Sequence, residues 1–165
     1  MRKAVALGRD YNAAILSSPF IVRAVNWTAS RDKLRAVRRA VFIEEQHVPE
    51  ELEWDDGDER AYHVLATSTE GDAIGTGRLK LDGQIGRMAV ARDWRRRGVG
   101  AAILQSLIEL ARKEGCSVVR LHAQTHALDF YARQGFIAVG GEFEEAGIPH
   151  CAMELRLEPG RVTSD

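Results

Sequence analysis

The sequence predicts an α/β (α+β) single domain built on a mixed sheet, and two observations lead to this class. First, apolar runs with strand character alternate with helical segments in the order β-α-β-β-β-α-β-α-β-β. Second, the amphipathic segment 98–114 lies between two of the strand segments, and such a β-α-β unit requires parallel pairing. The last two strand segments are expected to pair antiparallel, so the sheet is mixed.

The first half of the chain is expected to hold one helix and four strands. Residues 20–26 have strand character, and Ser30 is a candidate N-cap for a helix that ends at Pro49. Residues 44–59 contain nine acidic residues and neither lysine nor arginine, which is typical of a connecting loop. The Asp82-Gly83 pair is a hairpin turn signal. Further strands are expected over residues 61–67, 74–81 and 85–91.

The second half begins with the clearest helix of the sequence. Apolar residues recur on one face of 98–114, and Gly115 occupies the position expected just past a helix end. A short helix is expected to stop at Gly135, and the last two strands are expected to be joined through Gly147 and Pro149. The expected bounds are 117–122, 136–143 and 150–157 for the strands and 127–134 for the short helix.

Composition limits the possible classes of protein. The chain has 165 residues, 45% of them hydrophobic, so one domain of ordinary core size is expected over residues 19–158. Residues 1–18 are expected to be an N-terminal extension and residues 159–165 a polar tail. Two isolated cysteines predict neither a zinc site nor a disulfide framework. No segment resembles a signal peptide or a membrane span, so a cytoplasmic protein is expected.

The most informative stretch follows the strand 85–91. Four arginines lie in a short loop, and Gly98 and Gly100 then open the long helix. The first N–H groups of a helix lack intrahelical partners, and the helix dipole adds positive charge there. Glycines allow a large anion to approach the backbone. The segment therefore predicts a phosphate or pyrophosphate site, although Ala101 and Ile103 match neither a P-loop nor a dinucleotide fingerprint.

These residues resemble the acetyl-CoA-binding signature of the GNAT acetyltransferases. The run Arg95-x-x-Gly98-x-Gly100 is similar to the Gln/Arg-x-x-Gly-x-Gly/Ala motif of that family. A second landmark is similar as well, Ala127-x-x-Phe130-Tyr131-x-x-x-Gly135-Phe136. Further positions resemble the ElaA-type branch, namely Phe42, Glu45, Gln46, Glu51, Glu53, Asp58, His63 and the segment 147–150. The resemblance implies a GNAT-like, mostly antiparallel twisted sheet with a splayed central parallel strand pair and helices on both faces.

The resemblance also implies how acetyl-CoA, the co-substrate, is held without a metal. Backbone amides of the loop and helix start are expected to bind the pyrophosphate, and the strand 88–90 is expected to pair with the pantetheine arm. Gln124, which replaces a common asparagine, is expected to contact that arm. The implied donor-binding residues are Met88, Ala89, Val90, Arg95, Arg96, Arg97, Gly98, Val99, Gly100, Ala101 and Gln124.

The implied reaction moves an acetyl group to a primary amine. Tyr131 is expected to protonate the leaving thiolate, since a phenol keeps its proton at neutral pH. The amine must lose a proton, and candidate bases are His63, His122, His150 and the acidic stretch, with His150 and Glu45 preferred. A related hypothesis is that carboxylates such as Glu51 and Glu53 attract a cationic acceptor.

Three function classes remain open on the sequence alone. The favoured one is an N-acetyltransferase that acts on a small-molecule or peptide amine, as a monomer or homodimer. A non-catalytic acyl-CoA-binding or regulatory domain is the alternative. A nucleic-acid module is opposed by the net charge of −1 and by the acidic stretch, and a membrane partner is not expected.

Overall fold

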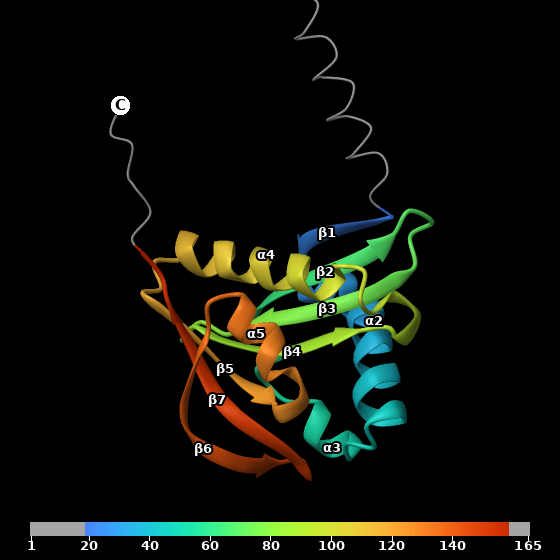
Figure 1. The fold of residues 1–165 in the computed structure, drawn as a ribbon. Coiled ribbons are helices and arrows are strands. Elements are labelled where there is room, and N and C mark those ends of the chain that lie inside the picture. The colour runs from blue at the N-terminus through green and yellow to red at the C-terminus, as the bar shows by residue number, and fades with distance from the viewer. Residues whose placement is uncertain (1–18, 159–165) are drawn as a thin grey trace, which may run out of the picture.

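The computed structural model describes residues 19–158 and contains one seven-stranded sheet with the strand order β1-β2-β3-β4-β5-β7-β6 (Figure 1). Every neighbouring pair is antiparallel except β4 and β5, which are parallel. This confirms the predicted mixed, mostly antiparallel sheet. The strands are β1 (Phe20–Val25), β2 (Tyr62–Ser68), β3 (Ala73–Leu79), β4 (Gln84–Val90), β5 (Val118–Gln124), β6 (Ile137–Glu145) and β7 (Ile148–Arg156). The predicted extension 1–18 and tail 159–165 lie outside the described residues.

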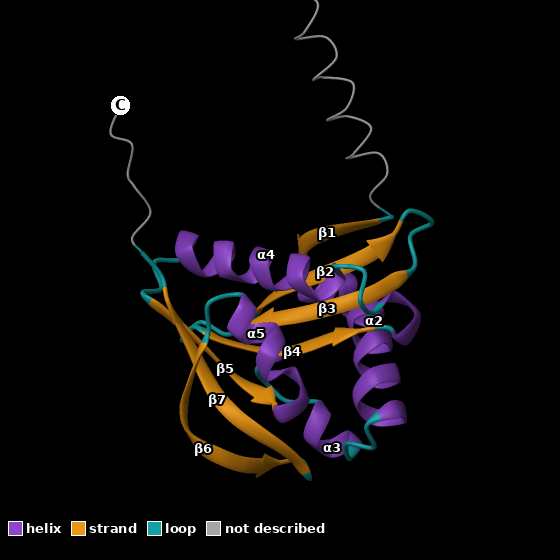
Figure 2. Cartoon of the chain, in the orientation of Figure 1, coloured by secondary structure: helices purple, strands orange, loops and turns teal. Residues whose placement is uncertain are grey.

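Helices cover both faces of the sheet, as predicted (Figure 2). On one face Trp27 and Leu34 of α2 pack with Leu65 of β2, while on the other face α4 packs against β1 to β4. The helical segments are α2 (Trp27–Arg38), the π-helix η1 (Arg39–Glu45), α3 (Glu50–Glu53), η2 (Asp58–Arg60), η3 (Arg92–Trp94), α4 (Val99–Lys113), η4 (Thr125–Ala127) and α5 (Leu128–Arg133). Among residues 19–158, no helix is both long and apolar enough to cross a membrane.

The first helix differs from the sequence-based expectation at both ends. Its N-cap is Asn26, whose side-chain oxygen accepts a hydrogen bond from the Ala29 amide at 3.2 Å, so Ser30 lies in the first turn. The regular helix ends at Arg38, because the chain widens into η1 before it reaches Pro49. A π-helix often marks a functional segment, and η1 places Glu45 and Gln46 beside the central strands.

The parallel pair β4–β5 separates soon after it begins. Register pairs join Gln84 to Arg120 and Ile85 to Leu121, and no later residues of these two described strands are paired. Within β4 a bulge follows Gly86, where the register with β3 shifts and Arg87 adopts a positive φ of 51°. The divergence leaves one edge of β4 without a strand partner, which confirms the predicted splay.

Close packing of α4 on β3 depends on two glycines in the strand. A Cβ placed on Gly75 would lie 2.7 Å from Ile103, and a Cβ placed on Gly77 would lie 2.7 Å from Leu107. A side chain at either position would therefore force Ile103 or Leu107 of the helix to move. The core that results holds the N-terminus of α4 at the end of β4 where the two strands have separated.

The final hairpin has a tighter turn than expected, because β6 continues to Glu145 and β7 begins at Ile148, whereas strands ending at residue 143 and starting at residue 150 were predicted. Ala146 and Gly147 form the two-residue turn, with φ values of 52° and 76°, whereas Pro149 lies inside β7 opposite Glu144. Pro149 is tolerated there because the pairing of β7 with β5 begins only at His150. The turn directs the end of β6 toward the space between β4 and β5.

Candidate active site

The N-terminus of α4 presents free backbone donors. Gly98 is the N-cap in a left-handed conformation with φ 84°, and no side chain among the described residues caps the helix. Arg96 also has a positive φ of 61°, so the loop curls tightly before the helix begins. The first helical hydrogen bond runs from the Ala102 amide to the Gly98 carbonyl at 3.1 Å, which leaves the preceding amides available to an anion.

The two glycines of the motif differ in whether the structure requires a glycine at their position. Gly98 has open space around its missing Cβ, so its left-handed backbone explains why a glycine suits this position. A Cβ on Gly100 would lie 3.5 Å from Phe130, which is ordinary van der Waals contact. Backbone conformation therefore explains the glycine at position 98. No steric contact within the protein requires a glycine at position 100.

The loop arginines make three distinct arrangements. Arg95 donates from both terminal nitrogens to the Glu45 carboxylate at 2.6 Å, and its Nε donates to the Val90 carbonyl at 3.0 Å. The Arg97 guanidinium lies 5.0 Å from the ring centre of Trp94. Arg96 is exposed. Arg95, with Arg92 at 3.5 Å from the same carboxylate, thus ties the loop to the end of β4 and to η1, while Arg96 and Arg97 remain exposed.

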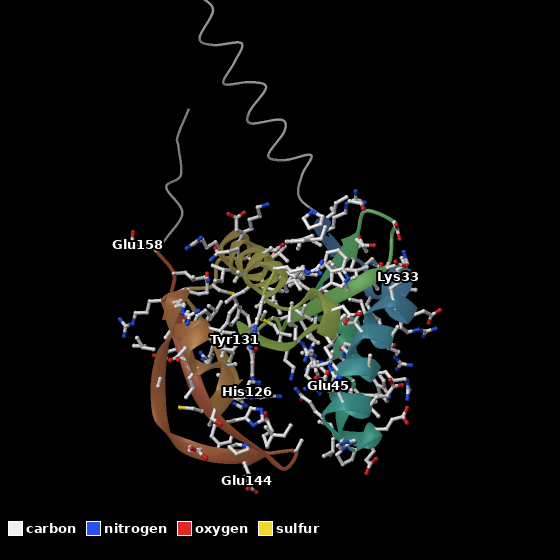
Figure 3. All side chains as sticks on the ribbon, turned by 45° about the vertical axis from the view of Figure 1, so that its right-hand side comes forward. Lys33, Glu45, His126, Tyr131, Glu144 and Glu158 are labelled. Atoms are coloured by element: carbon white, nitrogen blue, oxygen red, sulfur yellow. The ribbon has the colours of Figure 1, made fainter. Side chains whose placement is uncertain are left out.

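A cavity of about 860 Å³ lies between the separated ends of β4 and β5. Most of the predicted site residues outside the loop line this cavity, whereas residues 96–101 do not. In Figure 3 the labelled Tyr131 and His126 approach this region from the C-terminal half and Glu45 from the N-terminal helices. The predicted residues that line it are Glu45, Met88, Ala89, Val90, Arg95, Gln124, Tyr131 and His150.

Tyr131 lies on α5 with its hydroxyl directed at β4. The hydroxyl donates to the Met88 sulfur at 3.8 Å, and the ring meets Phe130 edge-on with centres 5.0 Å apart. Burial disfavours the charged phenolate and raises the pKa of Tyr131 to about 12. The group is therefore a protonated donor throughout the neutral and mildly alkaline range, next to the strand expected to carry the donor.

The side-chain amide of Gln124 forms two hydrogen bonds with the side-chain amide of Gln46. Each side chain donates to the other, at 2.9 Å and 3.3 Å, and the pair joins the end of β5 to the end of η1. Both residues line the cavity. The resemblance to the ElaA-type branch includes Gln46 but implies no role for it. Its position opposite Gln124 depends on a tertiary contact between segments that are 78 residues apart.

Of the histidines considered as bases, His150 and His122 line the cavity and His63 does not. His150 is 7% exposed, and its Nδ1 donates to the Ile148 carbonyl at 2.6 Å. His122 donates from Nδ1 to the Glu145 carboxylate at 3.1 Å. His63 is buried between α2 and the sheet, bonded to the Asp58 carbonyl, and burial lowers its pKa. His63 is a core residue in this structure.

Glu45 reaches the cavity but is held by arginine. The hydrogen bonds from Arg95, opposed in part by burial and aided by the charge of Arg95 and Arg92, lower the pKa of Glu45 below its usual value. A carboxylate with a lowered pKa is a weaker base. The same contact fixes the orientation of Arg95.

The acidic stretch is more than the connecting loop that the sequence suggested, because it includes short helices and two buried carboxylates. It contains α3 and η2, and Glu53 and Asp58 are 3% and 2% exposed. The arginines that pair with these carboxylates come from α2, β3 and β4, outside the acidic stretch. The sequence of the stretch alone therefore could not predict the ion pairs. The cluster consists of Glu53, Asp55 and Asp58 with Arg38, Arg78 and Arg87.

The ion pairs of Glu53 argue against the hypothesis that this carboxylate attracts a cationic acceptor. Arg38 donates to Glu53 at 2.7 Å and to Asp58 at 2.8 Å, so these charges are already matched. For Asp55, burial acts to raise the pKa, but the hydrogen bonds and charge of Arg78 outweigh it and the pKa is lowered. Glu51 is exposed and does not line the cavity.

Two cavity residues were missed by sequence reasoning. Arg87 lies at the β4 bulge and donates to the Asp55 carboxylate at 3.2 Å, and Glu145 ends β6 beside the two histidines. A positive φ cannot be recognised from an arginine in a strand pattern, so Arg87 offered no signal. The signal available for Glu145 was the Ala146-Gly147 pair that follows it, because a two-residue turn at this pair places Glu145 at the end of a strand. Within residues 19–158 no group of three or more His, Cys, Asp or Glu side chains is arranged to hold a metal ion.

Comparison with known proteins identifies the family. The Acetyltransferase (GNAT) domain matches residues 27–157, which is most of the chain. The protein belongs to the GNAT acetyltransferase family. It is 35% identical over 142 residues to the uncharacterized protein YyaT of Bacillus subtilis, an alignment that covers 82% of this chain and 95% of that protein.

Solved structures agree with the assignment to the GNAT acetyltransferases. Escherichia coli ElaA superposes with a TM-score of 0.73 at 26% identity, covering 82% of this chain and 98% of that one. An acyl-CoA N-acyltransferase from Pseudomonas aeruginosa superposes with a TM-score of 0.69 at 26% identity, covering 82% and 97%. The resemblance to ElaA inferred from the sequence is thus confirmed, and the protein is an acyltransferase whose family uses an acyl-CoA co-substrate.

Proposed function

We propose that this protein transfers an acetyl group from acetyl-CoA to a primary amine of a small molecule or peptide, by direct attack of the amine on the thioester. The observation that carries the proposal is the open cavity between β4 and β5. It runs from Val90 and Arg95, which precede the uncapped start of α4 in the chain, to a histidine-lined chamber. Acetyl-CoA supplies an activated thioester carbonyl when bound. Everything else must come from this chain.

The residues on the donor side fit such a co-substrate. The amides of Val99, Gly100 and Ala101 can hold the pyrophosphate, because the helix is uncapped and Gly98 curls the chain in front of it. Arg96 and Arg97 can add charge-assisted hydrogen bonds from the exposed loop. The free edge of β4 from Met88 to Val90, with Ala89 between them, can pair with an extended amide-containing arm. Gln124 can donate to that arm if it leaves Gln46.

Two proton transfers complete the proposed chemistry. Tyr131 donates its proton to the departing thiolate, a role supported by its raised pKa and by its position against Met88. His150 removes the proton of the amine, because its Nδ1 is occupied by the Ile148 carbonyl and its Nε2 is therefore the free basic nitrogen. Glu45 is the weaker candidate as a base, and we assign it the orientation of Arg95.

Calorimetry with CoA and an acetyl-CoA-dependent thiol-release assay test the proposal. The assay panel contains amino acids, polyamines, amino sugars and lysine peptides. Binding of CoA together with transfer to at least one amine is expected. Absence of heat on CoA addition contradicts the proposal, whereas CoA binding with no transfer to any amine would favour the non-catalytic acyl-CoA-binding alternative.

A tyrosine variant tests the acid. Tyr131→Phe is expected to lower kcat by about 100-fold, because general acid catalysis contributes on this scale, and to leave the Kd for CoA unchanged. Tyr62→Phe is the matched control, since Tyr62 lies on β2 away from the cavity and should alter neither quantity. Equal kcat values for the two variants would make the Tyr131 hydroxyl structural.

A further inference from the structure

Glu145 is the cavity carboxylate whose charge the fold does not neutralise with arginine. Four carboxylates line the cavity, and Glu45, Glu53 and Asp55 are each paired with a guanidinium. Within the described part of the chain, the ion-pair partners of Glu145 are the imidazoles of His122 and His150, at 3.1 Å and 3.7 Å.

The hydrogen-bonding pattern leaves two acceptor atoms facing each other. The Ile148 carbonyl can only accept, so the Nδ1 of His150 carries the hydrogen, and in the neutral imidazole the Nε2 carries a lone pair. That Nε2 lies 3.7 Å from Oε2 of Glu145, too far for a direct hydrogen bond. A donor placed about 2.8 Å from each atom would satisfy both of them.

The surrounding structure holds this arrangement in place. Phe143 stacks on the His150 ring with centres 6.0 Å apart and meets the His122 ring edge-on at 5.0 Å. Glu145 directly precedes the Ala146-Gly147 turn, where a non-glycine residue is held at a positive φ. Such backbone strain persists where the surrounding structure over-determines it, and here it orients the end of β6.

We propose that the acceptor binds as an alkylammonium ion between Nε2 of His150 and Oε2 of Glu145, and that Glu145 is a second catalytic residue. The inference rests on the proposed function and names its substrate class: amines that are cationic at neutral pH. An N–H bond of the ammonium breaks, its electron pair stays on the nitrogen, and the proton bonds to Nε2. The carboxylate of Glu145 stabilises the imidazolium so formed, and the neutral amine attacks the thioester carbonyl.

Other charged groups of the cavity do not offer the same site. Arg78 and Arg87 are paired with Asp55, and further titratable groups that line the cavity are Lys80, which follows β3, His122 of β5 and His126 of η4. Cationic groups repel an ammonium ion, and Gln124, which lies opposite His150 in the sheet register, is neutral. His122 binds the second oxygen of Glu145 and leads from the cavity toward solvent, since its side chain is 38% exposed.

A pair of glutamine variants tests the proposal. Glu145→Gln keeps the shape of the side chain and removes its charge, and Glu144→Gln does the same to its exposed neighbour, which does not line the cavity. Propylamine is the alkylammonium probe, and aniline, already neutral at pH 7, needs no deprotonation before it attacks the thioester. Glu145→Gln is expected to lower kcat/KM for propylamine at least about tenfold and to leave that for aniline within about twofold. Glu144→Gln should change neither.

Unchanged propylamine turnover in Glu145→Gln overturns the proposal, and so does an equal loss with both amines, which would indicate a structural role. Two measurements decide the matter even without turnover. Imidazole NMR should show that the neutral form of His150 carries its hydrogen on Nδ1, and a neutral form with the hydrogen on Nε2 would contradict the site. Propylammonium should bind to the CoA-saturated protein at least about tenfold more weakly in Glu145→Gln. Failure of CoA to bind wild-type protein would instead count against the proposed function.

Discussion

The two ends of the cavity are built in opposite ways. The proposed donor end uses backbone groups from one continuous stretch, in which β4, the loop and the start of α4 follow each other in sequence. The proposed acceptor end uses side chains from η1, α3, β5 and the β6–β7 hairpin, which are scattered through the chain. Charges are mostly exposed at the donor end, whereas at the acceptor end Arg38, Glu53 and Asp58 are buried and paired.

This difference teaches which parts of the site depend on the rest of the fold. Backbone donors at a helix start form whenever the helix forms, so the donor end needs little support from distant residues. Buried ion pairs exist only when every partner is in place, because an unpaired buried charge is costly. Three variants sharpen the comparison, beginning with the largest expected effect.

Removal of a buried guanidinium should damage the acceptor end most. Arg38→Ala leaves Glu53 and Asp58 without their shortest hydrogen bonds, and we expect a loss of about 3–5 kcal/mol in the free energy of unfolding. Urea denaturation measures this loss. Arg31→Ala on the same helix is the control, because Arg31 is exposed.

The comparison also predicts what Arg38→Ala spares. In the fraction that remains folded, the Kd for CoA should be unchanged, since the helix N-terminus does not depend on the buried cluster. A loss of stability below about 1 kcal/mol would show that the cluster is not an interdependent unit.

The next largest effect is expected from the two motif glycines, which should not respond alike. Gly98→Ala places a Cβ on a left-handed residue, which costs about 1 kcal/mol, and the resulting loop movement should raise the Kd for CoA up to about tenfold. Gly100→Ala puts a Cβ in ordinary contact with Phe130 and should be close to neutral. Calorimetric titration of CoA into both variants measures the difference. A larger effect at Gly100 would show that close anion approach, not backbone conformation, governs this position.

The smallest effect is expected where the two ends meet, at the partly exposed pair of Glu45 and Arg95. Glu45→Gln should lower stability by less than about 1 kcal/mol at neutral pH. Because Arg95 lowers the folded-state pKa of Glu45, the stabilisation is present above the unfolded-state value of 4.5 and is lost as the pH falls through the lower folded-state value. The difference between wild-type and variant unfolding curves should therefore disappear in acid. A difference that grows in acid would contradict this sign.

Sequence reasoning succeeded for structure that is local and failed for contacts between distant segments. The helix 98–114 was predicted within one residue at each end, because its apolar face and Gly115 are written in neighbouring positions. The start of α2 was misplaced, because Asn26 and Ser30 are both good caps and the choice depends on how Trp27 packs. Arg38, Arg78 and Arg87 could not be matched to the acidic stretch before the sheet was assembled.

By itself the sequence predicted the class of fold, the resemblance to the GNAT family and a candidate anion-binding turn at Gly98, because periodicity and short motifs are carried by residues that are close together in the chain. Only the tertiary structure decided the acceptor end, including the burial of Glu53 and the meeting of His122, His150 and Glu145. The physical reason is that residues form ion pairs and hydrogen bonds with the groups that lie close to them in space. Proximity across a sheet is set by register and turn geometry, which no single segment carries.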